Sequence, residues 1–437
     1  MKRRIMSKDE QHKLGLVSAT AMSVTIVVGA GLLALPGLSY AHAGRLGYLP
    51  WLLMTFVMLP LLAIFSFFAQ RNPSAGGVVG YIGISLGPRW AAISQVIILG
   101  TFSLGIPAIV LIGAIHLHQI LPGLPTMAAA LGILTTSLLL SLSGMKVSGA
   151  VQTGIALLII LGLTGLSTGY WLQAPQADAS AASAALPTSA WAAGAGVLSA
   201  VPIILYAYTG WEMTAFLAED MQDPHRNLPR SIWGSFIVVS LLYVFVAWTV
   251  ASAATPSDAW RLTPIAQLAR SWLGQPGLLI TSLIATLLIF ANVTAAFLSA
   301  SRAVFSAGRE GRLPQALART DHRGLPVHAM LATWAVFVTV VVLSQAGGLG
   351  VDALMQLTGQ NFFVIYLLAT IGYTRLQTRP GPRLLGMAST LLVLAMMSLF
   401  SLPGLLYCGT LALLGHLTFR PATAPPAACG EAPPRSS

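Results

Sequence analysis

Long apolar runs alternate with short polar connectors along almost the whole chain. Each run is close to the roughly 20 residues with which a helix crosses a bilayer. Read by hydropathy, the pattern predicts about twelve membrane-spanning helices and thus an all-α polytopic membrane protein. The predicted spans lie at about 14–38, 47–69, 90–115, 124–143, 150–172, 196–218, 231–255, 277–303, 328–346, 353–374, 383–401 and 404–420.

Composition and the placement of charge agree with this pattern. Hydrophobic residues make up 56% of the 437 residues and charged residues only 8%, which is unlike a soluble domain. The net charge of +11 comes from basic residues in the connectors, where they indicate topology rather than a nucleic acid partner. With the N-terminus inside, all of the 23 Lys and Arg residues lie on the cytoplasmic side except Arg45, Arg261 and Arg270. We therefore expect a multi-pass protein of the bacterial inner (plasma) membrane with both termini cytoplasmic.

The first span is interrupted near its middle by Gly29-Ala30-Gly31. Backbone groups freed by an interruption have no partner in lipid, so they must face protein or a ligand. The N–H groups at the start of the second half of this span favour an anion. Carbonyls at the end of the first half, near Val27, favour a cation. The alternative is a purely structural role, in which small residues only allow two helices to pack closely.

A second interruption, Thr209–Gly210, falls in the sixth span, five spans later. An odd number of spans means that the second copy enters the membrane from the opposite side. Interrupted helices at matching positions of two inverted halves are the best sequence indication of a transporter's binding site. Carbonyls around Tyr206–Thr209 would complete the binding site for a cation. N–H groups on one side and carbonyls on the other suit the zwitterion of an α-amino acid.

Glu212 is the acidic residue that lies far inside an apolar span. A carboxyl group in a membrane is costly and is a functional candidate by default. It could carry a proton that is coupled to transport, since burial raises the pKa of a carboxyl group. It could equally be a neutral group that hydrogen-bonds the interrupted backbone, and both readings stay open.

The remaining candidates suggest a neutral substrate and no catalysis. Side chains near the presumed cavity are Val27, Tyr206, Tyr208, Trp211 and Phe297, without a second buried acid to pair with a cationic substrate. An apolar pocket discriminates weakly between methylene groups, so several apolar amino acids are expected. His116-x-His118 has no third metal ligand and is interpreted as an interfacial structural pair. No nucleophile–base pair or phosphate loop occurs, so we expect neither an enzyme nor a cofactor.

Several motifs together resemble one family. They are Gly29-Ala30-Gly31 before Pro36, Pro73-Ser74-Ala75-Gly76-Gly77, Gly210-Trp211-Glu212, Asp223-Pro224-His225-Arg226-Asn227-Leu228-Pro229-Arg230 and Gly308-Arg309-Glu310-Gly311-Arg312-Leu313-Pro314. In this order, across about residues 14–375, they resemble the amino acid–polyamine–organocation (APC) superfamily. The residues of these motifs are most similar to those of its amino acid efflux branch, which includes exporters of methionine and branched-chain amino acids.

The resemblance implies a LeuT-type five-plus-five inverted repeat with two extra C-terminal helices. The repeats would be residues 14–172 and 196–374, between a cytoplasmic N-terminus (1–13), an external loop (173–195), two helices (375–420) and a disordered tail (421–437). Backbone of Gly29, Ala30 and Gly31 would hold the substrate carboxylate, and carbonyls of Tyr206 and Thr209 beside Gly210 would hold its ammonium group. Glu212, with Trp211 before it, would act in coupling or gating.

Two positions depart from the family pattern. Ala30 replaces the Ser or Thr that often stands between the two glycines, so a backbone site survives but a hydroxyl is lost. Some proton-coupled relatives carry a lysine inside the fifth span, and none lies there in this chain. The expectation is a secondary transporter that exports methionine, leucine, isoleucine and valine, with a proton as coupling ion and sodium as the alternative. An importer or exchanger and a non-transporting sensor are the alternatives, and the protein is expected to be a monomer or homodimer.

Overall fold

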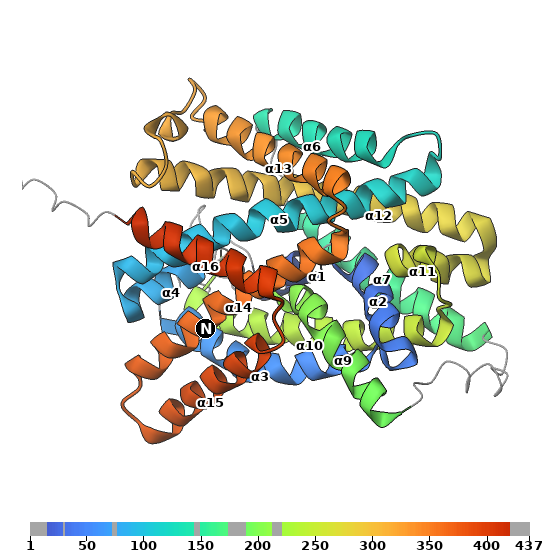
Figure 1. Ribbon diagram of the computed structural model, residues 1–437, viewed down its shortest axis with the longest axis horizontal. Helices are drawn as coiled ribbons and strands as arrows, with labels where there is room; N and C mark the ends of the chain where they lie inside the picture. The colour runs from blue at the N-terminus through green and yellow to red at the C-terminus, as the bar shows by residue number, and fades with distance from the viewer. Residues whose placement is uncertain are drawn as a thin grey trace, which may run out of the picture.

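The computed structural model describes residues 15–28, 31–71, 77–143, 149–173, 189–211 and 221–419. Within these ranges all regular structure is helical (Figure 1). The predicted N-terminal segment, the tail, most of the external loop, Gly29, Ala30 and Glu212 lie outside the described residues.

The helices follow the hydropathy pattern closely. They are α1 (Leu16–Val28), α2 (Gly31–Ala43), η2 (Gly44–Leu46), α3 (Leu49–Arg71), α4 (Gly77–Leu86), α5 (Pro88–Ile120), α6 (Thr126–Leu142), α7 (Gly149–Gln173), α9 (Ala190–Ile204), η3 (Leu205–Tyr208), α10 (Pro224–Ala253), α11 (Asp258–Leu262), α12 (Pro264–Arg309), η5 (Gln315–Ala318), α13 (Val327–Gly347), α14 (Val351–Leu376), α15 (Pro380–Met397) and α16 (Leu402–Leu417). In the described chain, nine of them are long and apolar enough to cross a membrane. The other three predicted spans correspond to the pair α1 and α2, to α6 and to α16, which are shorter helices.

The eighth predicted span lies within a helix that has an additional segment before it. The eighth span was expected at 277–303, but α12 begins at Pro264 and runs for 46 residues. It bends at Gly274, whose φ of 67° is a left-handed conformation that favours glycine. Pro276, shortly after the bend, fits the start of a helical segment because its missing N–H needs no partner there. Hydropathy located the segment after the bend and missed the shorter, less apolar segment before it.

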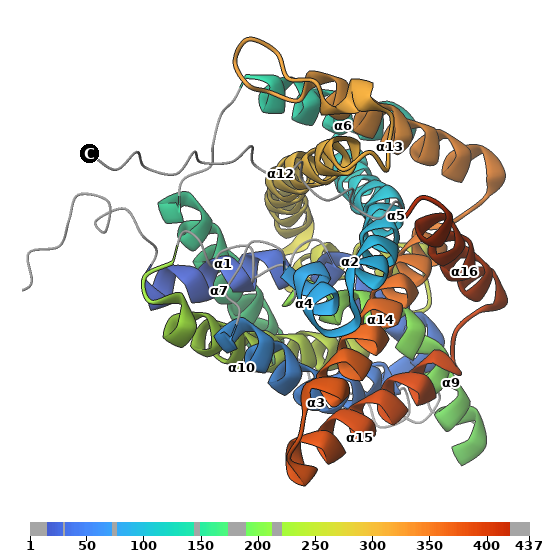
Figure 2. The ribbon, with the colours of Figure 1, turned by 90° about the vertical axis from the view of Figure 1, so that its left-hand side faces the viewer.

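Helices that occupy matching places in the two halves pack against one another. α3 packs on α10, α5 on α12, and α6 on α13, which are the second, third and fourth spans of each predicted half. α1 packs on α7 in the first half, as α9 and η3 pack on α14 in the second. Figure 2, viewed along the bundle, shows α5 and α14 near the centre and α13, α15 and α16 toward the outside.

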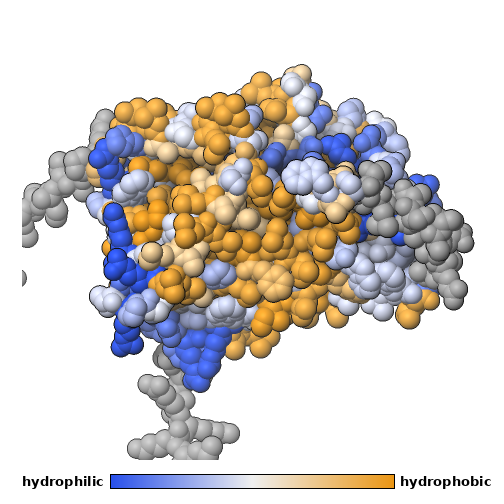
Figure 3. All heavy atoms as spheres, turned by 60° about the horizontal axis from the view of Figure 1, so that its bottom comes forward, coloured by the Kyte–Doolittle hydropathy of each residue, from blue (hydrophilic) through white to orange (hydrophobic). Residues whose placement is uncertain are grey.

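The surface has the pattern of a membrane protein. In Figure 3 hydrophobic side chains form a broad band between two ends at which hydrophilic residues gather. Large apolar side chains of the described helices, such as Leu241 of α10 and Leu283 of α12, are 69% and 49% exposed. A bilayer that covers the band satisfies these side chains, since they would be costly in water.

Candidate functional site

The second predicted interruption is a break in the described chain, whereas the first falls on Gly29 and Ala30, outside the described residues. α1 ends at Val28 and α2 begins at Gly31, on either side of the undescribed Gly29 and Ala30. In the sixth span α9 tightens into η3, which ends at Tyr208. Thr209 then adopts an extended conformation, and Gly210 has a φ of 112°. A side chain at Gly210 would be strained, because L residues rarely adopt this φ.

Tyr243 of α10 joins the first halves of the two interrupted spans. Its hydroxyl lies 2.9 Å from the carbonyl oxygen of Val27 and 3.1 Å from that of Ala207, and it can donate to either. Both carbonyls belong to the sets predicted to favour a cation. A neutral hydroxyl donor therefore occupies the place between the two helix ends where those carbonyls converge.

An aromatic cluster supports this arrangement. The ring of Tyr243 meets Tyr208 edge-on, with centroids 5.4 Å apart, and meets Trp51 of α3 edge-on at 5.0 Å. The hydroxyl of Tyr208 donates to the carbonyl of Trp51 at 2.8 Å and lies 2.8 Å from the Thr55 hydroxyl. Tyr208, expected to line a substrate site, thus points its polar atom at α3 and fixes η3 there.

Tyr206 faces the opposite way, toward three glycines from other spans. A Cβ built at Gly31 would lie 3.7 Å from Cδ1 of its ring, and one at Gly105 of α5 would lie 3.5 Å from Cε2. A Cβ at Gly359 of α14 would lie 3.0 Å from its backbone nitrogen. Leu205, Ala207 and Tyr208 are buried, whereas Tyr206 is partly exposed although η3 lies inside the bundle. The ring of Tyr206 therefore lies between Gly31 of α2 and Gly105 of α5.

The carbonyls of the turn are already engaged. The carbonyl oxygen of Tyr206 accepts from the Thr209 N–H at 3.2 Å and from the Thr209 hydroxyl at 2.8 Å. Because Ala207 is bonded to Tyr243, two carbonyls of η3 are satisfied within the protein. A substrate ammonium group would have to use their second lone pairs or other acceptors of the turn.

Phe297 lies at another level of the bundle. It is fully buried, and its ring meets Phe337 of α13 edge-on at 6.0 Å. Ala285 and Leu288 of α12 line a cavity together with Val28, beside the interruption. Phe297 is nine residues beyond Leu288, which is roughly 13 Å along a helix. This geometry favours residues 281–288 over Phe297 as neighbours of the first interruption. Trp211 is fully buried and meets Phe236 of α10 edge-on at 5.5 Å.

The cavity beside Val28 is aliphatic. Its volume is about 160 Å³. It is lined by Val28, Leu32 and Leu33 of the first span, by Leu158, Ile159, Gly162, Leu163 and Leu166 of α7, and by Ile265, Thr281, Ile284, Ala285 and Leu288 of α12. Thr281 is its only polar lining residue, so the described wall offers no charge to a bound ion.

The histidine pair is more buried than expected. His116 is fully buried, and neither of its ring nitrogens has a hydrogen-bond partner among the described residues. His118 contacts the carbonyl of Leu124 through Nδ1 at 2.9 Å. His116 lies four residues before the end of α5, so the interpretation as an interfacial structural pair stays a prediction. No group of three or more potential metal ligands occurs in the described ranges.

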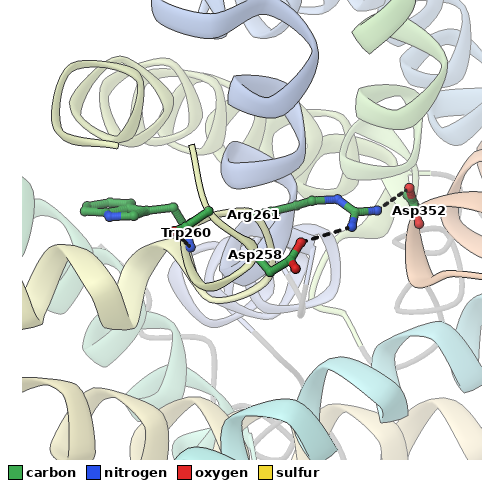
Figure 4. Close-up of polar contacts among 5 residues, drawn as sticks. Asp258, Trp260, Arg261 and Asp352 are labelled. Atoms are coloured by element: carbon green, nitrogen blue, oxygen red, sulfur yellow. Dashed lines mark hydrogen bonds and ion pairs between the residues drawn. The ribbon is translucent and has the colours of Figure 1, made fainter. Parts of the chain in front are cut away.

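An ion pair joins α11 to α14. Arg261 of α11 lies 2.7 Å from Asp352, in the first turn of α14, and 3.7 Å from Asp258 (Figure 4). A methyl group at Gly37 of α2 would overlap the backbone carbonyls of Trp260 and Arg261. α11 therefore lies tightly against α2 while its arginine reaches α14.

Sequence comparison places the chain among known proteins. A family model described as amino acid permease matches residues 14–414. Amino acid permease YecA of Bacillus subtilis is 26% identical over 94% of this chain and 96% of its own length. The L-methionine/branched-chain amino acid exporter YjeH of Escherichia coli is 27% identical over 92% of this chain and 96% of its own. The cadaverine/lysine antiporter of E. coli is 22% identical over 79% of each chain.

Proposed function

This chain belongs to the amino acid permease family, and we propose that it is a secondary transporter that exports neutral apolar amino acids by alternating access. The substrates proposed are methionine, leucine, isoleucine and valine. The similar exporter from E. coli carries methionine and branched-chain amino acids in its name, which supports both the substrate class and the direction. The membrane proposed is the plasma membrane, with both termini in the cytoplasm.

The observation that carries this proposal is the meeting of the two interrupted spans at Tyr243. Its hydroxyl lies within hydrogen-bonding distance of carbonyls from both α1 and η3. This brings the start of α2 close to η3, as the contact between Gly31 and Tyr206 also indicates. Backbone of Gly29, Ala30 and Gly31 would bind the carboxylate, and acceptors of the turn from Tyr206 to Gly210 would bind the ammonium group.

A neutral apolar side chain suits the described surroundings. The cavity beside Val28 is aliphatic, and the other side chains near the start of α2 are Leu35 and the ring of Tyr206. A cationic substrate side chain would need a buried acidic partner. The described acidic residues, Asp223, Asp258, Glu310, Asp321 and Asp352, lie at helix ends or in connectors.

The packing of counterpart helices supports the proposed inverted repeat of residues 14–172 and 196–374. We propose α15 and α16 as two helices added to this ten-helix unit. The coupling ion is proposed to be a proton that uses Glu212. The described wall beside α7 has no carboxylate that could bind a sodium ion and no lysine that could take the place of one.

A flux assay with purified protein in liposomes tests the function. Vesicles loaded with unlabelled leucine are expected to take up labelled methionine and leucine by counterflow, and labelled lysine or glutamate should stay outside. Exclusion of all apolar amino acids would contradict the transport proposal. Binding without counterflow would instead favour the sensor. Direction is tested in cells fed methionine-containing dipeptides, where loss of the protein should raise intracellular methionine.

An exchanger is the second candidate, because one of the similar proteins is named an antiporter. It differs from the exporter in its need for substrate on both sides. Efflux from loaded vesicles into substrate-free buffer separates the two. An exporter releases its load when a proton gradient is imposed, whereas an obligate exchanger retains it.

A further inference from the structure

A groove on the side of the bundle lies apart from the two helix interruptions. Two cavities of about 390 and 210 Å³ share the lining residues Leu99, Ser103, Val304 and Leu313. Together they form one groove along α5, with α16 on one side and α12 and α13 on the other. The end-on view of Figure 2 shows α5 between α16 and α12.

The groove is apolar along its length and basic at one end. Arg312 lines it and contacts both Gln95 of α5 and Glu310, the latter at 2.8 Å. Arg89, in the first turn of α5, contacts His416 near the end of α16. Among the described side chains named at this end are thus two guanidinium groups, those of Arg89 and Arg312, and one carboxylate, that of Glu310. An excess of positive charge remains there.

The dimensions of the groove match one leaflet of a bilayer. Its wall on α5 runs from Gln95 to Ser103, eight residues or roughly 12 Å of helix. Half of a hydrocarbon core is about 15 Å. Arg89 lies six residues before Gln95, roughly 9 Å further along the helix, which is the depth of lipid headgroups. The adjacent Trp90 is 41% exposed, as is typical of a tryptophan at the membrane interface.

The surface around the groove also faces lipid. Leu413 and Leu414 of α16 and Val336 of α13 are 44 to 58% exposed. A water-soluble ligand would have to cross this apolar surface, whereas a lipid of the surrounding leaflet reaches it by lateral diffusion.

We propose that this groove is a binding site for an anionic phospholipid. One acyl chain lies along α5 between α16 and α12, and the phosphate lies at Arg89 and Arg312. Guanidinium groups bind phosphate oxygens with paired hydrogen bonds. A zwitterionic lipid brings a compensating cation to the same place and so gains less. The site tethers α16 to the transporting unit through a lipid, independently of which amino acid is carried.

Native mass spectrometry of the purified full-length protein tests the site. The protein is mixed with equal amounts of phosphatidylglycerol and phosphatidylcholine that have the same acyl chains. The wild type is expected to retain phosphatidylglycerol preferentially. Each arginine near an anionic headgroup contributes about fivefold in affinity, so R89Q/R312Q should lose most of the preference. The matched control R379Q/R383Q removes two exposed arginines at the start of α15 and should retain it.

A groove-filling variant tests the acyl chain separately. Ser103 borders both cavities, and its hydroxyl bonds only within its own helix, to Leu99 at 2.9 Å. Ser103→Leu should therefore lower the retention of both lipids without a large loss of stability. Equal retention of the two lipids by the wild type would overturn the proposal, and so would an unchanged preference in R89Q/R312Q. Cross-links between copies across α16 that persist when lipid is added would make the groove a protein interface instead.

Discussion

Tyr243 is the residue on which the proposed site depends most. Tyr243→Phe keeps the ring that packs on Trp51 and Tyr208 and removes the donor shared by Val27 and Ala207. Leaving a buried acceptor unpaired costs about 1–3 kcal/mol. If this cost falls on the conformation that transports, we expect the maximal rate of counterflow to fall by about fivefold or more, since 1.4 kcal/mol corresponds to tenfold.

The control for this change is Tyr407→Phe. Tyr407 donates to the carbonyl of Gly100 at 3.0 Å, between α16 and α5 and away from the interruptions. It should keep its transport rate. Equal loss in both variants would mean that Tyr243 stabilises the fold in general and has no special place in transport.

The sequence located the backbone of the site better than its side chains. Gly29–Gly31 and Thr209–Gly210 stand out because glycine interrupts an apolar run. Tyr243 does not stand out, because its partner Val27 is 216 residues away and nothing local marks the pair. A tyrosine in the middle of the seventh span was the available signal. Phe297 was chosen by hydropathy of its helix, which gives no information on depth relative to another span.

At the scale of elements, α16 is fastened to α14 by polar side chains in the membrane interior. Gln360 is fully buried, and its amide oxygen would collide with a methyl group at Gly404. The thiol of Cys408 donates to the amide oxygen of Asn361 at 2.8 Å.

Gly404→Ala should therefore push α16 away from α14 and lower the thermal unfolding midpoint of the purified protein. Gly409→Ala is the control on the same helix, because a methyl group there meets nothing within 4 Å. An equal midpoint for both variants would show that Gln360 moves aside at no cost.

The ion pair between α11 and α14 is a second contact between elements. Arg261 and Asp352 are 37% and 29% exposed, so solvent screens the pair and its contribution to stability is small. Its effect should instead be on opening of this end, where α11 lies against α2. Arg261→Gln is expected to raise the reactivity of a cysteine placed at the buried Thr263, directly after α11, toward a membrane-impermeant reagent. The exchange R261D/D352R should restore protection, whereas a control cysteine on the exposed face of α15 should be unaffected. Unchanged reactivity in Arg261→Gln would mean that the contact with α2 alone keeps this end closed.

These elements also show where hydropathy was sufficient. The predicted spans all have helices because a long apolar run has no other stable form in lipid. α11 was not predicted, since its five residues include Asp258 and Arg261 and its place is set by contacts with α2 and α14. The pairing of α3 with α10 and of α5 with α12 joins segments far apart in the chain. It follows from the resemblance to a known fold and could not be read from periodicity.

For the molecule as a whole, very few groups are candidates to carry a proton that is coupled to transport. Described acidic residues lie at helix ends or in connectors, and the cavity beside α7 is uncharged. The titratable candidates are therefore Glu212, which lies outside the described residues and is placed inside a span by the sequence alone, and His116, which is buried four residues before the end of α5. If Glu212 carries the proton, Glu212→Gln should make the rate of methionine efflux from vesicles independent of an imposed pH gradient. His116→Gln should keep the dependence, and counterflow at equal pH should survive in both. A response to the pH gradient that persists in Glu212→Gln but disappears in His116→Gln would assign the proton to α5. If the response to the pH gradient persists in both variants, a group other than Glu212 and His116 carries the coupled proton.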